Sequence, residues 1–328
     1  MSNILEMLHM NRKWLNCMLV SLCLAVALWP EYGDAKQNTG GGGDLSALRL
    51  TDLGTLTRAE GESFQGLAIS GNTLVSLSNK GIATLYSIMQ DGTAKRGITF
   101  HLASYGGHNH ANVASFGRER YSKGDALPLL YISQCKQSKG EGTSDACYVE
   151  RITPDGQANA VQTIILDNHD KYYGNAVQWV VDKRRKMLVG FGNTINNYDK
   201  ANKFRIMTFR LPKINQGRTV VLGEKDIVEN YLIQDYDATF PSVQIGQGAT
   251  IVGHCLVMPT GVGTEQYPSV IYSWDLKRHR MVSVRNMQDK VPYEFEDCDL
   301  YDGRLYIQCN KGASGKLLLL GAEKDTKR

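Results

Sequence analysis

Short apolar runs separated by turn-forming residues make up nearly the whole chain after Leu48. A representative stretch is Phe64–Ser70, followed by Gly71 and Asn72 and then by Thr73–Leu77. Runs of about four to eight residues bounded by Gly, Asn, Asp or Pro are typical of β-strands, and we find no apolar pattern of helical period over about a dozen residues. The pattern therefore predicts an all-β protein.

The predicted strands group into five imperfect units with up to four strands each. The units recur at intervals of about 45 to 65 residues, which is the spacing of blades in a β-propeller. The run Arg218–Leu222 is expected to be the fourth strand of the third unit. The first strands of the five units are expected at Phe64–Ser70, His110–Phe116, Gly174–Val181, Phe240–Ile245 and Glu294–Leu300.

The two ends of this region complement each other. The fifth unit stops after its third strand, Lys316–Leu320, whereas an extra strand, Leu48–Leu56, precedes the first unit. Pairing these two strands would complete the last blade and remove an open sheet edge. We therefore expect five four-stranded blades closed by the N-terminal strand.

Two further motifs add to the strand pattern. Gly107–Asn112 (GHNHAN) and Pro128–Ser133 (PLLYIS) are similar to motifs of secreted bacterial and phage-associated propeller proteins of unassigned function. Together with the strand period and the closure, the region Leu48–Gly321 resembles a five-bladed β-propeller at the level of the superfamily. A six-bladed ring with one blade misread and an irregular β-sandwich are the alternative folds.

The N-terminus has the pattern of an export signal. A basic segment, Met10–Lys13, precedes the apolar run Trp14–Trp29, and Gly33-x-Ala35 fits a cleavage site between small residues. We expect residues 1–35 to be a signal peptide in an exported protein of the periplasm, cell surface or exterior. A start at Met10, an uncleaved membrane anchor and lipidation at Cys23 are the alternatives; contact with a membrane is expected only in the last two cases.

The rest of the chain divides into three parts. Residues 36–47 include the run Gly40–Gly43 and are expected to be a flexible linker. Residues 48–322 form the predicted propeller, and residues 323–328 a C-terminal tail.

Five cysteines follow the predicted signal. Cys135 and Cys147 flank one apparent hairpin loop and Cys298 and Cys309 another, so both pairs are predicted disulfides in an oxidising compartment. Cys255 lies in an apolar run and is expected to be a buried thiol. The spacing of the cysteines is too wide to indicate a zinc site.

Composition excludes some classes of function. The chain has 328 residues, of which 42% are hydrophobic, and 37 basic against 33 acidic residues give a net charge of +4. Nucleic-acid binding is not indicated, because it requires a concentrated basic patch. No glycine-rich nucleotide loop precedes a helix, and the sequence identifies no cofactor and no metal ligand set.

The candidate site is the mouth of the central channel, where the loops that enter the innermost strands converge. We expect His108, His110, Asn112, Asn175 and Glu296 to approach one another there. Because His108 and His110 alternate, both would point to one face of a strand, as ligand contacts, as a metal pair or as structural anchors of loop carbonyls. The ligand-binding candidates are His108, His110, Asn112, Asn175, Gln178 and Glu296.

An acidic run, Glu294–Asp299 (EFEDCD), begins the fifth unit. Paired carboxylates there could act on a glycosidic bond or bind calcium, or the run could be a solvated loop. Five-bladed glycosidases draw their carboxylates from separate blades, which this chain does not reproduce.

The leading functional hypothesis is a non-catalytic module that binds a glycan or another envelope component. The rivals are a carbohydrate-active hydrolase or lyase that uses His108 or His110 with carboxylates of the fifth unit, and a scaffold for a protein partner. The sequence does not identify catalytic residues, and fold alone does not decide among these functions.

Overall fold

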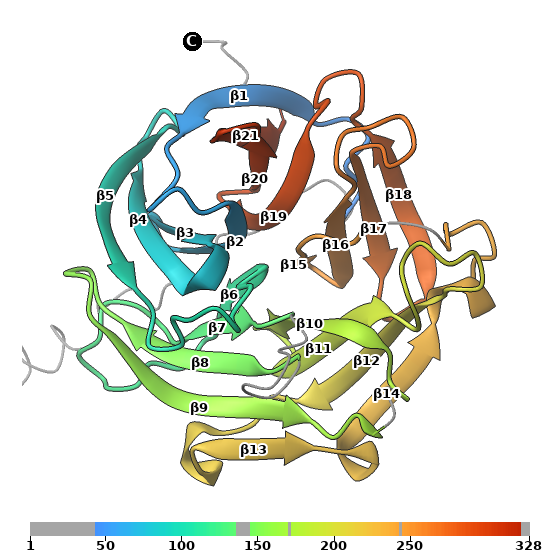
Figure 1. The fold of residues 1–328 in the computed structure, drawn as a ribbon, viewed down its shortest axis with the longest axis horizontal. Coiled ribbons are helices and arrows are strands. Elements are labelled where there is room, and N and C mark those ends of the chain that lie inside the picture. The colour runs from blue at the N-terminus through green and yellow to red at the C-terminus, as the bar shows by residue number, and fades with distance from the viewer. Residues whose placement is uncertain (1–42, 136–144, 170–171, 243–244, 323–328) are drawn as a thin grey trace, which may run out of the picture. The chain divides into compact units, whose positions relative to one another are not determined.

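The computed structural model describes residues 43–135, 145–169, 172–242 and 245–322, and the predicted signal peptide and C-terminal tail lie outside these ranges. The described residues form five sheets, antiparallel apart from one outer pair in blade 2, arranged as the blades of a propeller (Figure 1). No helix in these ranges is long and apolar enough to span a membrane. The predicted all-β, five-bladed fold is confirmed.

The strands run outward from the centre within each blade. Blade 1 consists of β2 (Phe64–Ser70), β3 (Thr73–Ser78), β4 (Ile82–Ile88) and β5 (Ala94–His101). Blade 2 contains β6 (Val113–Phe116), β7 (Leu130–Ser133), β8 (Cys147–Ile152) and β9 (Ala158–Leu166), and blade 3 contains β10 (Asn175–Asp182), β11 (Met187–Asn193), β12 (Phe204–Arg210) and β14 (Ile227–Leu232). Blade 4 contains β15 (Thr250–Val252), β16 (Cys255–Thr260), β17 (Val270–Asp275) and β18 (Arg280–Asn286), and blade 5 contains β19 (Glu294–Tyr301), β20 (Arg304–Lys311), β21 (Ser314–Gly321) and β1 (Arg49–Leu56).

The ring is closed by its N-terminal strand, as the sequence predicts. β1 pairs antiparallel with β21, with Arg49 opposite Gly321 and Leu56 opposite Gly315. Lys316 Nζ also lies 2.8 Å from the Asp52 carboxylate across this pair. The last blade thus holds both ends of the propeller (Figure 1).

One strand lies in a different blade from the one predicted. β13 (Thr219–Leu222), expected as the outer strand of blade 3, adds to blade 2 by parallel pairing with β9. The Gln162 side chain of β9 holds the preceding loop, because its Nε2 donates to the carbonyls of Lys213 and Gly217, each at 3.0 Å. The outer strand of blade 3 is β14, which pairs with β12.

The innermost strand of blade 4 is also displaced along the chain. The sequence suggested Phe240–Ile245, whereas β15 begins at Thr250. Phe240 is buried among the side chains of blades 3 and 4. Its apolar character therefore reflects packing between blades, and not a position on the innermost strand.

Buried side chains fill the space between each pair of neighbouring blades. The described residues contain five apolar clusters, one at each junction, such as Trp179 and Phe209 of blade 3 with Tyr131 and Val149 of blade 2. Facing sheets of a propeller bury their side chains against each other, so the core is distributed around the ring.

Two buried aspartates of β19 connect the innermost strands. Asp297 Oδ2 accepts hydrogen bonds from the backbone N–H of Leu67 in β2 at 2.8 Å and of Ala114 in β6 at 3.0 Å. Asp299 accepts from Ile69 N at 2.7 Å and from Thr250 Oγ1 in β15 at 2.8 Å. The acidic run is therefore neither a solvated loop nor a row of carboxylates facing the channel mouth; its aspartates hold blades together.

The residues of the predicted linker that the structure describes contact blade 4. Leu45 is 4% exposed and joins the apolar cluster between blades 4 and 5. Arg285 Nη1 donates to the Leu45 carbonyl at 2.5 Å.

Candidate functional site

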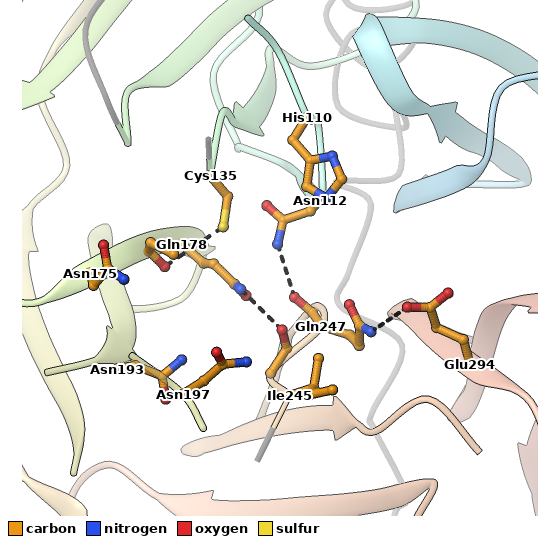
Figure 2. A pocket seen from close by; sticks show the side chains of 12 residues that line it. His110, Asn112, Cys135, Asn175, Gln178, Asn193, Asn197, Ile245, Gln247 and Glu294 are labelled. Carbon is orange, nitrogen blue, oxygen red and sulfur yellow. Dashed lines mark hydrogen bonds between the residues drawn. The ribbon is translucent and has the colours of Figure 1, made fainter. Parts of the chain in front are cut away.

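A pocket of about 260 Å³ lies where the innermost strands begin. Blades 2, 3, 4 and 5 all contribute residues to it, from strand ends and from the loops beside them (Figure 2). Carboxamide side chains dominate the lining. They are Asn112, Asn175, Gln178, Asn193, Asn197 and Gln247.

Strand β10 places two of these carboxamides by means of a bulge. The register with β11 shifts between Asn175, which faces Asn193, and Gln178, which faces Phe191. Ala176, inside the bulge, has φ of 54°, a left-handed conformation that costs a non-glycine residue about 1–3 kcal/mol. Such strain persists only where the surrounding structure enforces it, and here it turns β10 at the pocket.

The segment before β6 repeats this arrangement. Ala111 has φ of 54°, and its N–H donates to the buried Asn109 Oδ1 at 3.0 Å. The next residue, Asn112, enters the pocket. Ala111 and Ala176 thus both have a left-handed backbone conformation. Each precedes a carboxamide side chain that lines the same cavity.

The carboxamides of Asn112 and Gln178 are held in a fixed orientation. Asn112 Nδ2 donates to the Gln247 carbonyl at 3.2 Å, and Gln178 Nε2 donates to the Gly246 carbonyl at 3.3 Å (Figure 2). Both side chains are at least nine-tenths buried, yet Asn112 Oδ1 and Gln178 Oε1 have no hydrogen-bond partner among the described residues. Buried polar atoms normally have a partner, so these two acceptors indicate a missing one.

His110 lines the pocket with a defined tautomer. Its Nδ1 lies 3.1 Å from Asn79 Oδ1, while Asn79 Nδ2 donates to Glu62 Oε2 at 3.0 Å. Because the Asn79 oxygen is an acceptor, His110 Nδ1 carries the proton. Glu62 in turn pairs with Lys80 at 2.5 Å, so a chain of polar contacts orients the imidazole.

His108 does not share the position of His110. Residues 107–112 are a loop and not a strand, so the alternation that would put both rings on one face does not apply. The His108 ring instead lies edge-on to Tyr148, with ring centroids 6.2 Å apart, and does not line the pocket. A metal pair of these two imidazoles, one of the alternatives left open by the sequence, has no support in this geometry.

At the fifth blade the structure brings Glu294, and not Glu296, to the pocket. Glu294 Oε1 accepts from Gln247 Nε2 at 3.0 Å (Figure 2). Glu296 is 2% exposed and is hydrogen-bonded by Asn310 Nδ2. Burial, and then the neighbouring charge of Glu294, raise the pKa of Glu296 well above its usual value. Glu296 occupies a bulge between Phe295 and Asp297, and it does not line the pocket.

Cys135 also lines the pocket. Its Sγ lies 3.7 Å from the Ala176 carbonyl, to which the thiol donates. Burial raises the pKa of the Cys135 thiol, and the nearby charge of Asp145 raises it further. A thiol that stays protonated is a poor nucleophile, so this cysteine is not activated for attack.

The predicted disulfides are absent from the described residues. In blade 5 the register places Cys298 opposite Ile307 and Cys309 opposite Phe295, so the two thiols do not face each other. In blade 2 Cys147 faces Ser133 and is buried, whereas Cys135 lies beyond the strand end and points to Ala176. Both disulfides were predicted from the spacing of the cysteines around apparent hairpins, and the positions of the cysteines in the paired strands do not allow them.

Sequence reasoning missed Asn193, Asn197, Gln247 and the pocket position of Cys135. Gln247 lies between Gly246 and Gly248, just before β15. Asn193 ends β11 and Asn197 follows in the next loop, which emerges on the same side of the propeller as the starts of the innermost strands. The loops between second and third strands could therefore have been included as candidates.

No protein-family model and no curated protein matches this chain. Among solved structures, the chain is similar to the tail fiber of Staphylococcus aureus phage P68, with 11% identity and a TM-score of 0.49 over 85% of this chain and 54% of that one. It is similar to Myxococcus xanthus glutaminyl cyclase, with 10% identity and a TM-score of 0.46 over 84% of this chain and 98% of that one. These likenesses carry no conclusion about function, and the chain spans about half the length of the tail-fiber chain.

Proposed function

We propose that this protein is a non-catalytic binding module for a glycan, which it holds in the carboxamide pocket at the centre of the propeller. Carboxamides donate and accept hydrogen bonds without charge, and sugar hydroxyls do the same. Six such side chains around one cavity of about 260 Å³ match a ligand that carries many hydroxyl groups.

The observation that carries the proposal is the pair of acceptors on Asn112 and Gln178. Leaving a buried acceptor unpaired costs about 1–3 kcal/mol. The amide nitrogens of both side chains are bonded to backbone carbonyls, so neither group can rotate to hide its oxygen without losing a bond. A bound hydroxyl or N–H group would recover this cost.

Aromatic side chains near the mouth offer flat apolar surfaces. Tyr198 follows the pocket residue Asn197 and is 57% exposed. Its ring packs edge-on against Tyr267 of the blade 4 loop, with centroids 5.5 Å apart. Large aromatic faces with a polar tip suit contact with the apolar side of a sugar ring, so a second sugar unit could rest here.

The lining favours binding over hydrolysis. A glycosidase of the usual kind needs two carboxyl groups on either side of the scissile bond. Glu294 is the single carboxylate among the described lining residues, while Glu296 is buried outside the lining in contact with Asn310. We include in the proposal an exported location, on the basis of the signal-like pattern in residues 1–35.

A glycan array with the purified protein tests the proposal. The double variant Asn112→Ala/Gln178→Ala removes both acceptors, and Asn159→Ala/Gln90→Ala, at exposed positions, is the matched control. We expect the pocket variant to lose the retained glycans and the control to keep them. An array on which wild-type protein retains no glycan, or on which a folded pocket variant retains the same ones, would refute the proposal.

A further inference from the structure

The pocket lining carries an acidic side chain. Among its described lining residues Glu294 is ionisable to an anion, and none is a lysine or an arginine. A cavity with walls of low dielectric constant concentrates the field of such a charge.

Two described cations that connect to lining residues through other side chains are engaged outside the pocket. Lys80 Nζ pairs with Glu62 at 2.5 Å. Arg58 Nη2 donates to the Gly312 carbonyl at 2.7 Å and to Asn310 Oδ1 at 3.4 Å. Neither cation lines the pocket, so the negative field of Glu294 acts on whatever enters.

The pocket lining also offers defined hydrogen-bond acceptors. The amide nitrogens of Asn112 and Gln178 are bonded to backbone carbonyls, and their oxygens remain for a ligand. Glu294 still offers lone pairs beyond those that Gln247 Nε2 and Asn310 Nδ2 use. A ligand that complements this surface is rich in donors, and a protonated amine has three donors and no acceptor.

We propose that the pocket selects a sugar that carries an unacetylated, protonated amino group, with Glu294 as its counter-ion. This inference rests on the proposed function and names the class of glycan. Sugars with carboxylate or phosphate groups are disfavoured, because they meet the like charge of Glu294 and no lysine or arginine among the described lining residues. Acetylation of the amine removes both the charge and two donors, and therefore lowers the affinity.

Calorimetric titration of the full-length protein tests the inference. The probes are three β-1,4-linked oligomers of equal length, made of glucosamine, N-acetylglucosamine and glucose, at a pH below the pKa of the amine. A hydrogen bond to a charged partner exceeds a neutral one by enough to give the glucosamine oligomer about tenfold higher affinity than the glucose oligomer. This preference should shrink as salt concentration rises.

The variant Glu294→Gln separates charge from shape. Glutamine keeps an acceptor for Gln247 Nε2 and loses only the longer contact of 3.4 Å from Asn310 Nδ2, while the charge of the side chain is removed. We expect the preference for the glucosamine oligomer to disappear and the affinity for the glucose oligomer to stay within about twofold. The control Glu119→Gln changes an exposed carboxylate and should leave the preference intact.

The outcomes distinguish this inference from the proposed function. Equal affinity for the glucosamine and glucose oligomers, unchanged by Glu294→Gln, would overturn the amino-sugar inference and leave glycan binding in place. A preference that survives in Glu294→Gln would also overturn it. Failure of all three oligomers, with other glycans retained on the array, contradicts the inference alone, whereas an array that retains no glycan removes the proposed function as well.

Discussion

Asp297 should contribute strongly to the stability of the ring. Its carboxyl group accepts three backbone hydrogen bonds, from Leu67 N at 2.8 Å, Ala114 N at 3.0 Å and Cys298 N at 2.8 Å. These donors belong to the innermost strands of three blades, and all four residues are buried. Burial raises the pKa of Asp297, and the three N–H donors oppose this rise.

The variant Asp297→Ala leaves all three N–H groups buried without this acceptor. At about 1–3 kcal/mol for each, the loss is about 3 to 9 kcal/mol, which is comparable to the whole stability of a typical domain. Asp297→Asn keeps one acceptor oxygen and should lose less. Urea unfolding of both variants, beside the exposed control Asp155→Asn, measures the difference.

The order in which the three variants unfold tests the contribution of the Asp297 hydrogen bonds. We expect Asp155→Asn to unfold like the wild type, Asp297→Asn at lower urea, and Asp297→Ala at still lower urea or without a folded baseline. If Asp297→Ala unfolds within about 0.5 kcal/mol of the control, the bonds between blades contribute little and this reasoning is wrong.

Three further predictions follow from the fold. Deleting residues 1–56 removes β1 and should destabilise the whole ring, whereas deleting 1–42 should not; equal melting temperatures would contradict closure by β1. Arg151 lies 2.6 Å from Asp125 and holds the pKa of that carboxyl well below its usual range, so the pair stabilises the fold above about pH 4 and loses this effect as pH falls through the lowered pKa. Arg151→Gln should therefore lower stability at neutral pH and weaken its dependence on acid, as denaturation at several pH values would show; an unchanged dependence would argue against the pair. Alkylation of the unfolded protein without reductant should label both Cys298 and Cys309, and a mass that shows them bridged would contradict the register of β19 and β20.

The architecture could be predicted from the sequence because closure of the ring changes the number of strands at its two ends. An extra strand before the first unit and a missing strand after the last can be counted without knowing any contact, and β1 pairs with β21 as expected. The position of β13 could not be predicted in this way. Its apolar run fits either blade edge, and the choice depends on loop contacts such as those of Gln162.

The candidate site was predictable only in part, because bulges decide which side chains face the channel. Asn112, Asn175 and Gln178 follow from their places at the starts of innermost strands. An extra residue at Glu296 interrupts the alternation of faces in β19, so Asp297 reaches β2 while Glu294, before the bulge, lines the pocket. The alternation of apolar and polar residues along a strand does not indicate where such a bulge occurs.

A crystal structure of the protein with the glycan that it retains best would test the central claim most directly. We predict a sugar unit in the carboxamide pocket, with donors within hydrogen-bond distance of Asn112 Oδ1 and Gln178 Oε1 and an apolar ring face toward Tyr198. A second hollow, of about 190 Å³, lies between β1 and the outer part of blade 1, where it is lined by Leu53, Tyr86 and Arg96. Electron density for the sugar in that hollow, with the carboxamide pocket empty, would contradict the account.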